Sequence, residues 1–301
     1  METSGNTHRL TMTRYERKRV LITVKAYPQP SRSYDELVCT AGVLEDGSWV
    51  RIYPVPFKFI AENKLMAKYQ WVEVDLESRS DDFRPESYSP KNRRDLRDLS
   101  ALEKIGTERA WEDRKKYCLK NVYTSRRHLI EDSQDPKNIS LATFKPAEFL
   151  DFIIEPDERD WKQKWKAQLA QLDLFAQSAD EDATTRQAIR KLPYKFYYRF
   201  KDEEGEVSRL MIEDWEIGAL YWNCLRRAEG DEEVALEKVK QKYWDNFTTK
   251  KDLYLLPWNH SPMAPAKKRQ SICNRGSFLS SSNPAYAIIR MRRKITDFRA
   301  C

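Results

Sequence analysis

One predicted strand carries side chains that could recognise a nucleic acid. Trp49, Arg51 and Tyr53 alternate along it, and alternate residues of a strand share one face. Aromatic side chains around an arginine can stack on bases while the guanidinium group holds a phosphate. The competing interpretation is structural: Arg51 would pair with Glu73 or Asp75 on a neighbouring strand, and the aromatic rings would pack beneath helices. The pattern alone leaves both interpretations open.

A second set of such side chains lies in the loop after the fourth predicted strand. The segment Asp81–Tyr88 (DDFRPESY) concentrates ionisable and hydroxyl groups on an extended stretch stiffened by Pro85. Loops on a rigid scaffold often carry binding groups. Arg84 could hold a phosphate through two hydrogen bonds, and Glu86 could orient a sugar or a base. The alternative is a solvated connector in which aspartate and arginine pair locally.

A third set consists of two carboxylates, Glu213 and Glu216, at the start of a helix predicted over 213–228. Like charges held close together raise the pKa of one carboxyl group, and such a pair suits acid–base chemistry or a divalent metal. Acidic residues in the first turn of a helix also favour its dipole, which is a purely structural role. Together with Glu73 or Asp75, these two are candidate catalytic residues of a metal-assisted phosphodiesterase or nuclease.

The residue inventory argues against several other kinds of site. The 301-residue chain has only eight glycines and contains neither of the glycine-rich motifs that commonly cradle phosphates. Its five cysteines are scattered singly and its three histidines lie far apart in the sequence, which argues against a zinc site or a Ser/His/Asp triad. We therefore predict no metal and no cofactor. An odd number of cysteines without a secretion signal favours reduced thiols and a cytoplasmic location.

The charge of the chain is distributed unevenly. Residues 1–250 hold 44 Lys and Arg against 45 Asp and Glu, whereas residues 251–301 hold ten against two. A basic chain normally indicates a polyanionic partner, but the body here is neutral, so the net charge of +7 does not by itself favour nucleic acid. No apolar run approaches the roughly 20 residues of a membrane helix, and we predict no membrane association.

The apolar periodicity predicts an α+β fold with a small N-terminal β-barrel-like module, a helical middle and a C-terminal unit of a β-hairpin and helices. Four strands joined by short turns favour a small curled sheet or barrel; they are predicted over 19–27, 36–44, 49–55 and 70–77. The predicted organisation is a disordered N-terminus over 1–17, the barrel-like module over 18–90, a mixed helical and strand region over 91–177, a linker over 178–190, the hairpin with two helices over 191–256, and a basic tail over 257–301.

The tail from Pro257 onward differs in composition from the rest of the chain. Prolines interrupt strand ladders, clusters of Lys and Arg resist burial, and the apolar residues show no sustained period. These features predict a disordered tail with no strand paired into the core. A shifted reading frame is the alternative, because residues 257–259 read one base later permit Leu-Gly-Thr, and residues 272–281 permit an apolar strand ending in Pro-Pro.

Three motifs resemble those of an uncharacterised prokaryotic protein family. They are Val38–Gly42 (VCTAG), Trp49–Phe57 (WVRIYPVPF) and Arg84–Tyr88 (RPESY), and the resemblance extends over most of residues 18–256. Members of that family end in a Leu-Gly-Thr segment and an apolar strand closing with Tyr-Pro-Pro, from which this chain departs at Pro257. The resemblance supports the predicted domain organisation and implies no activity.

The function that these observations favour is a cytoplasmic protein that binds a nucleic acid or a nucleotide. Its predicted contacts are Trp49, Arg51, Tyr53, Arg84 and Glu86. The competing class is the metal-assisted phosphodiesterase or nuclease described above, and a third is a non-catalytic interaction scaffold. The sequence leaves open whether the protein is an enzyme, and it leaves the oligomeric state open.

Overall fold

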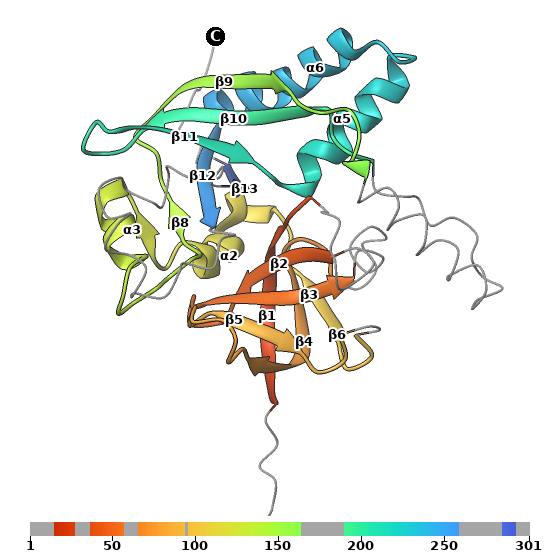
Figure 1. The fold of residues 1–301 in the computed structure, drawn as a ribbon. Coiled ribbons are helices and arrows are strands. Elements are labelled where there is room, and N and C mark those ends of the chain that lie inside the picture. The colour runs from red at the N-terminus through yellow and green to blue at the C-terminus, as the bar shows by residue number, and fades with distance from the viewer. Residues whose placement is uncertain are drawn as a thin grey trace, which may run out of the picture.

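The computed structural model of the protein describes residues 15–27, 37–56, 66–93, 96–163, 190–258 and 285–292. Two β-sheets carry the fold. In Figure 1 the N-terminal sheet, coloured red to yellow, and the strands of the C-terminal sheet, coloured green to blue, form two bodies joined along one side. The protein is therefore α+β, as the sequence predicted, with a barrel at its N-terminus.

The N-terminal sheet closes into a barrel. Its strands are β1 (Glu16–Lys25), β2 (Leu37–Val43), β3 (Trp49–Pro56), β4 (Gln70–Ser78), β5 (Ser87–Pro90) and β6 (Ser100–Lys104). They follow the order β1-β2-β3-β5-β4-β6, and β1 also pairs with β4, so the first five strands close on themselves. The β3–β5 pair is parallel, which makes this a five-stranded Greek-key barrel of the OB type. Closure leaves these five strands without a free edge.

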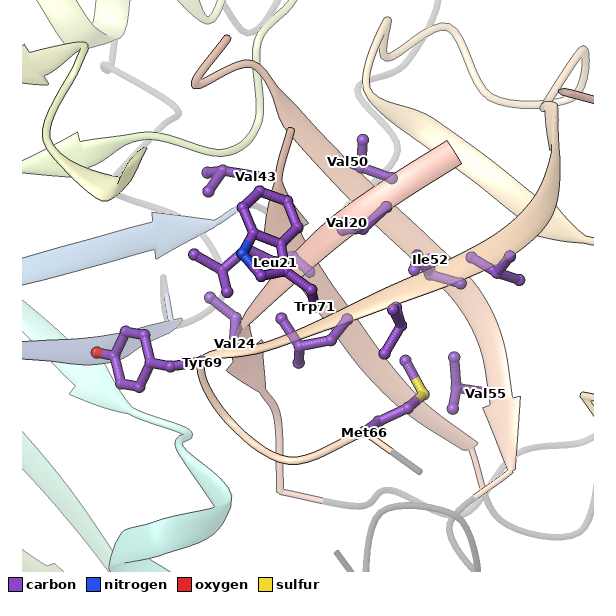
Figure 2. Close-up of a cluster of buried hydrophobic side chains, with 14 of the residues drawn as sticks. Val20, Leu21, Val24, Val43, Val50, Ile52, Val55, Met66, Tyr69 and Trp71 are labelled. Carbon is purple, nitrogen blue, oxygen red and sulfur yellow. The ribbon is translucent and has the colours of Figure 1, made fainter. Parts of the chain in front are cut away.

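Alternating side chains fill the barrel. Val50 and Ile52 of β3 are each 1% exposed and point into the interior (Figure 2). Because successive side chains of a strand point to opposite faces, Trp49, Arg51 and Tyr53 lie on the outer face of β3. The face of β3 that was predicted to bind a ligand is therefore on the outside of the barrel.

The C-terminal sheet has seven strands among the described residues. They are β7 (Val122–Tyr123), β8 (Thr143–Phe144), β9 (Glu148–Pro156), β10 (Tyr194–Lys201), β11 (Val207–Ile212), β12 (Lys251–Trp258) and β13 (Ala285–Arg292). Their order is β7-β8-β12-β13-β11-β10-β9, with antiparallel β9–β10–β11 at one end. Strand β13 joins the two parts of this sheet, because it pairs with β12 on one side and with β11 on the other.

Helices connect and cover the sheets. They are α2 (Glu108–Cys118), α3 (Arg126–Asp132), α5 (Trp215–Arg227), α6 (Glu232–Lys240), the π-helix η1 (Gln241–Asn246) and α7 (Phe247–Lys250). Aspartate side chains cap both long C-terminal helices, since Asp214 accepts from the Glu216 amide and Asp231 accepts from the Val234 amide. Of the helices in the described ranges, none is long and apolar enough to cross a membrane.

The C-terminal core is aromatic. Phe196, Tyr198 and Phe200 alternate along β10 and are at most 2% exposed. They face the helices, where the hydroxyl of Tyr198 donates to the carbonyl of Tyr243 in η1. The barrel core also takes in Leu256 of β12. The two sheets therefore share buried residues.

Most predicted elements are present at close to their predicted positions. The four predicted N-terminal strands correspond to β1–β4, and the predicted hairpin corresponds to β10 and β11. Strand β1 begins at Glu16, inside the segment predicted as a disordered N-terminus over 1–17. The barrel continues past residue 90, where the module was predicted to end, because β6 pairs with β4. The predicted linker over 178–190 lies, up to residue 189, outside the described residues.

The prediction that the tail contributes no paired strand is wrong for residues 285–292. Strand β13 pairs antiparallel with β12 from Ala285 to Arg292 and parallel with β11 at Met211 and Ile212. The segment AYAIIRMR has the β-branched and apolar character of a strand, and β12 and β11 offer it ladder partners on both sides. The flanking prolines and basic clusters outweighed this short run in the sequence prediction. Residues 259–284 and 293–301 lie outside the described residues.

Candidate functional site

The end of β1 meets the start of α5. Ala26 forms an antiparallel bridge with Asp214, and the amide of Tyr27 donates to the carbonyl of Glu213 at 2.6 Å. These backbone contacts hold Lys25, the last residue of β1, close to the first turn of the helix. The junction of the two bodies therefore carries Lys25, which ends the buried part of β1.

A second lysine joins this junction from the turn before β4. The ammonium of Lys68 lies 2.8 Å from Oδ2 of Asp214 and 3.3 Å from Oε2 of Glu216. The side chain of Asp214 is 1% exposed and that of Lys68 is 11% exposed, so the pair is largely removed from water. Glu216 is 40% exposed and connects the buried pair to solvent. One lysine of the barrel thus contacts both acids at the start of α5.

The backbone beside Lys68 is strained. Tyr69 has a φ of 62°, in the left-handed region that bulky side chains rarely adopt. Its amide donates to the carbonyl of Ile22 at 2.6 Å, and its carbonyl accepts from the amide of Ile105 at 2.8 Å. The guanidinium of Arg114 also lies over its ring, 4.0 Å from the centroid. These contacts hold the unusual conformation and so fix the direction in which Lys68 leaves the barrel.

A pocket of about 350 Å³ opens at this junction. Its charged wall comes from Lys25, Lys68 and Glu216, and Trp215 contributes an aromatic wall. The ring of Trp215 is stacked on that of Tyr27 at 5.6 Å between centroids. Cavities of this size bind small ligands, usually through an apolar lining with a few well-placed polar groups.

The π-helix η1 forms another wall of the pocket. Lys242 and Tyr243 line it from this segment, followed by Phe247 of α7. A π-helix is rare and often occurs at functional sites, because its wider turn displaces side chains from their α-helical positions. The ammonium of Lys242 is exposed and lies 5.6 Å from the centroid of the Phe247 ring. A third lysine is therefore available at the mouth of the pocket.

The environment changes the protonation of Lys25. Its residue is 3% exposed, and this burial, together with the positive charge of Lys68, lowers the pKa of Lys25 to about 8. The carboxylates of Glu216 and Asp214 act in the opposite direction, and Lys104 adds a small further lowering. A lysine in this state exchanges its proton close to neutral pH. The pocket thus contains a buried lysine whose pKa is lowered beside two further lysines.

Of the two predicted catalytic carboxylates, the structure places one in this pocket. Glu216 lines it and contacts Lys68, whereas Glu213 precedes the helix and contributes its backbone carbonyl to Tyr27. The helix was predicted to begin at Glu213, but its cap is Asp214 and its first residue is Trp215. The prediction of two acids on the first turn is therefore wrong for Glu213.

Arg51 and Glu86, predicted as ligand contacts, lie in a buried contact between the two bodies. Arg51 is 3% exposed and donates to the hydroxyl of Ser140 at 2.8 Å. Glu86 is 7% exposed and accepts from both the amide and the hydroxyl of Ser140. Ser140 itself is 3% exposed and comes from the connection between α3 and β8. In this arrangement both charged side chains bind the protein itself.

Replacing Ser140 with alanine tests this buried contact. We expect Ser140→Ala to lower the free energy of unfolding by about 1–3 kcal/mol, because Arg51 and Glu86 each lose a partner while they stay buried. Chemical denaturation measures the change. The control is Ser48→Ala, which removes an exposed hydrogen bond to Asp46 and should change the stability by less than about 0.5 kcal/mol. Equal effects of the two substitutions would contradict the prediction.

Arg84 pairs within its own loop. Its guanidinium makes two hydrogen bonds with the carboxylate of Asp82, at 2.8 and 2.5 Å. Burial opposes ionisation of Asp82, but hydrogen bonds from Arg84 and Ser87 lower its pKa to about 2. This is the local pairing that the sequence offered as the alternative to phosphate binding. Trp49 and Tyr53 are half-buried, and Arg79 lies over the Tyr53 ring at 5.4 Å.

The strand carboxylates proposed for a metal site also have basic neighbours. Arg17 lies 3.6 Å from Glu73 and 3.3 Å from Asp75, so among the described residues these carboxylates pair with Arg17 rather than with Arg51, the partner that the structural interpretation had suggested. Within the described ranges no group of three or more His, Cys, Asp or Glu side chains could hold a metal ion.

Sequence reasoning missed most of the pocket. Lys25 had a usable signal, since a lysine among apolar residues of a strand needs a special environment. Lys68 and Lys242 had none, because they lie among many other charged residues and gain their position from the fold. Trp215, the first residue of α5, also lines the pocket.

The fold and the pocket define an α+β protein in which a closed five-stranded barrel is joined to a mixed seven-stranded sheet, with a basic pocket at the junction. The chain belongs to the family described as domain of unknown function (DUF8757), whose model matches residues 121–287. A second model, domain of unknown function (DUF8758), matches residues 16–120. The DUF8757 match continues past Pro257, and the boundary between the two matches falls just after α2.

Comparison with characterised proteins adds little. No curated protein matches the chain. Among solved structures, a murine DNA-binding protein bound to double-stranded DNA is similar over 66% of this chain and 75% of that chain, with 8% identity and a TM-score of 0.28. A likeness of this size carries no argument about fold or function.

Proposed function

We propose that the protein binds a nucleotide, or the end of a nucleic-acid strand, in the pocket at the junction of the two bodies. The observation that carries this proposal is the combination of three lysines with an aromatic wall in one pocket of about 350 Å³. Lysines hold phosphate groups, and aromatic rings stack on bases without regard to sequence.

The pocket has a suitable group for each part of a nucleotide. Lys68 and Lys242 offer ammonium groups to a phosphate, and the Trp215 ring offers a face to a base. Glu216 is partly exposed, so it can accept a hydrogen bond from a sugar hydroxyl or a base amino group. The three lysines exceed the two carboxylates by one charge, which favours an anionic ligand.

The pocket is a better candidate than the outer face of β3. In barrels of the OB type the face of the second and third strands and the loop between the fourth and fifth strands commonly bind oligonucleotides. Here the corresponding residues Arg51 and Glu86 bind Ser140, and Arg84 binds Asp82. A ligand on that face would have to displace a buried contact of the protein.

Isothermal titration of the full chain with a nucleoside triphosphate and with a short single-stranded oligonucleotide tests the proposal. We expect Lys242→Ala to weaken binding about tenfold, as the loss of one charged contact to phosphate typically does. Affinity should also fall as salt concentration rises, because lysine contacts with phosphate release counterions.

The matched control is Lys240→Ala. Lys240 is also exposed and lies two residues away at the end of α6, but it does not line the pocket. Binding that is absent in the wild-type chain, or that falls equally in the two variants, would contradict the proposed function.

A further inference from the structure

Lys25 differs from the other two lysines of the pocket. It is the last residue of β1 and is 3% exposed, whereas Lys242 is exposed to solvent. Its side chain lines the pocket, with Lys68, Glu216, Asp214 and Lys104 as its charged neighbours. A phosphate needs an ammonium group, and Lys68 and Lys242 already supply two. The buried position of Lys25 in the pocket therefore points to a role other than phosphate binding.

Burial and a neighbouring cation together make a lysine nucleophilic. They lower the pKa of Lys25 to about 8. At pH 7 roughly a tenth of its side chains would then carry a neutral amine, against a few in ten thousand for an ordinary lysine. Lysines in apolar pockets, or next to a second cationic group, form Schiff bases with carbonyl substrates for this reason. Lys25 is buried and has Lys68 as a neighbouring cation, so it meets the second of these conditions.

We infer that Lys25 is a nucleophile that forms an imine with the aldehyde of a sugar phosphate bound in the pocket. The choice of substrate rests on the proposed function. A pocket that recognises phosphate and sugar also accepts the open-chain form of a deoxyribose phosphate that has lost its base. Lys68 and Lys242 would hold the phosphate, and the carbonyl carbon would face Lys25.

The reaction needs no oxidant, reductant or metal. The neutral amine of Lys25 attacks the carbonyl carbon, a C–N bond forms, and a proton passes from nitrogen to the former carbonyl oxygen. The resulting carbinolamine loses its hydroxyl group and the remaining N–H proton as water, which leaves the imine. Glu216 lies on the same pocket and is partly exposed, so its carboxylate can carry these protons between nitrogen and oxygen.

Two sources could supply this chemistry, namely free 2-deoxyribose 5-phosphate and an abasic nucleotide within a DNA strand. In one arm the full chain is incubated with the free sugar phosphate and sodium cyanoborohydride, which reduces an imine to a stable amine, and modified lysines are located by peptide mass spectrometry. We expect the adduct at Lys25 in at least tenfold higher yield than at exposed Lys240. In the other arm a single-stranded oligonucleotide with one abasic site and borohydride should give a covalent complex on a denaturing gel, and peptide mass spectrometry locates the modified lysine in this complex as well.

Lys25→Met should lose the adduct, and Lys240→Met should keep it. Because the adduct is mapped on the wild-type chain, the test remains decisive even if Lys25→Met fails to fold. An adduct in one arm alone identifies the source of the aldehyde. Yields at Lys25 no higher than at Lys240 in both arms would overturn the inference. Nucleotide binding without a Lys25 adduct would remove the nucleophile alone, whereas an adduct without nucleotide binding would remove the proposed function.

Discussion

Replacing Asp214 with alanine is expected to lower the free energy of unfolding by about 3–5 kcal/mol, which is the usual cost of breaking a buried ion pair by removing one partner. The carboxylate of Asp214 is 1% exposed and does two things at once. It accepts from the amide of Glu216 as the cap of α5, and it lies 2.8 Å from the ammonium of Lys68. Without it, Lys68 is left with Glu216 at 3.3 Å as its remaining acid. Chemical denaturation measures the loss.

Asp231 provides a matched control for the cap. Its side chain accepts from the Val234 amide at the start of α6, but the residue is exposed and, among the described residues, pairs with no lysine. Asp231→Ala should therefore cost only about 1 kcal/mol. Asp214→Asn keeps a capping oxygen and loses the charge, so its effect should fall between the two. An Asp214→Ala variant no less stable than Asp231→Ala would show that the ion pair contributes nothing.

Removing β13 is expected to lower the free energy of unfolding by at least as much as Asp214→Ala does. A chain that ends after Pro284 loses the whole β12–β13 ladder and the parallel pairs at Met211 and Ile212. Strands β12 and β11 would then present open edges, which favours aggregation. We expect a strong fall in the melting temperature and loss of solubility. In the intact chain, the amides of residues 285–292 should exchange slowly with solvent deuterium.

The control for this truncation is a chain that ends after Arg292, which keeps every pair of β13. Rapid exchange over 285–292, together with unchanged stability after truncation at Pro284, would contradict the structure and restore the prediction of a tail without a core strand. The shifted-frame interpretation of the tail stays a prediction, and the nucleotide sequence of the gene decides it.

Local patterns were sufficient to predict strands β1–β4 of the barrel and the β10–β11 hairpin of the C-terminal sheet. Clean alternation, as in Gln70–Ser78, and turn residues such as Gly47 and Gly205, which both have positive φ, act within a few residues along the chain. Strands β5 and β6 were missed because each is four or five residues long and polar. They form because β3 and β4 pair with them, and the local sequence of a short strand does not indicate its pairing partners.

The candidate site was harder to predict for the same reason. Lys68 contacts Asp214 because Tyr69 takes a left-handed conformation and the β1–α5 bridge brings Asp214 within reach. The predicted stripe on β3 does lie on the outer face, but no local signal indicated that Ser140, 89 residues from Arg51 in the sequence, would cover it. Charged side chains of the same type and spacing can bind a ligand or another part of the protein, and tertiary contacts decide between the two.

The boundary between the two family matches runs through the pocket. Lys25 and Lys68 come from the part of the chain before residue 120, whereas Asp214 and Lys242 come from the part after it. Either half produced alone would carry lysines without their acids, or acids without their main lysine partners. Genetic separation of the two halves should therefore abolish the site, and co-expression of the separated halves would regain it only by reassembling the whole junction. A function that depends on this site would therefore require the two halves to be inherited together.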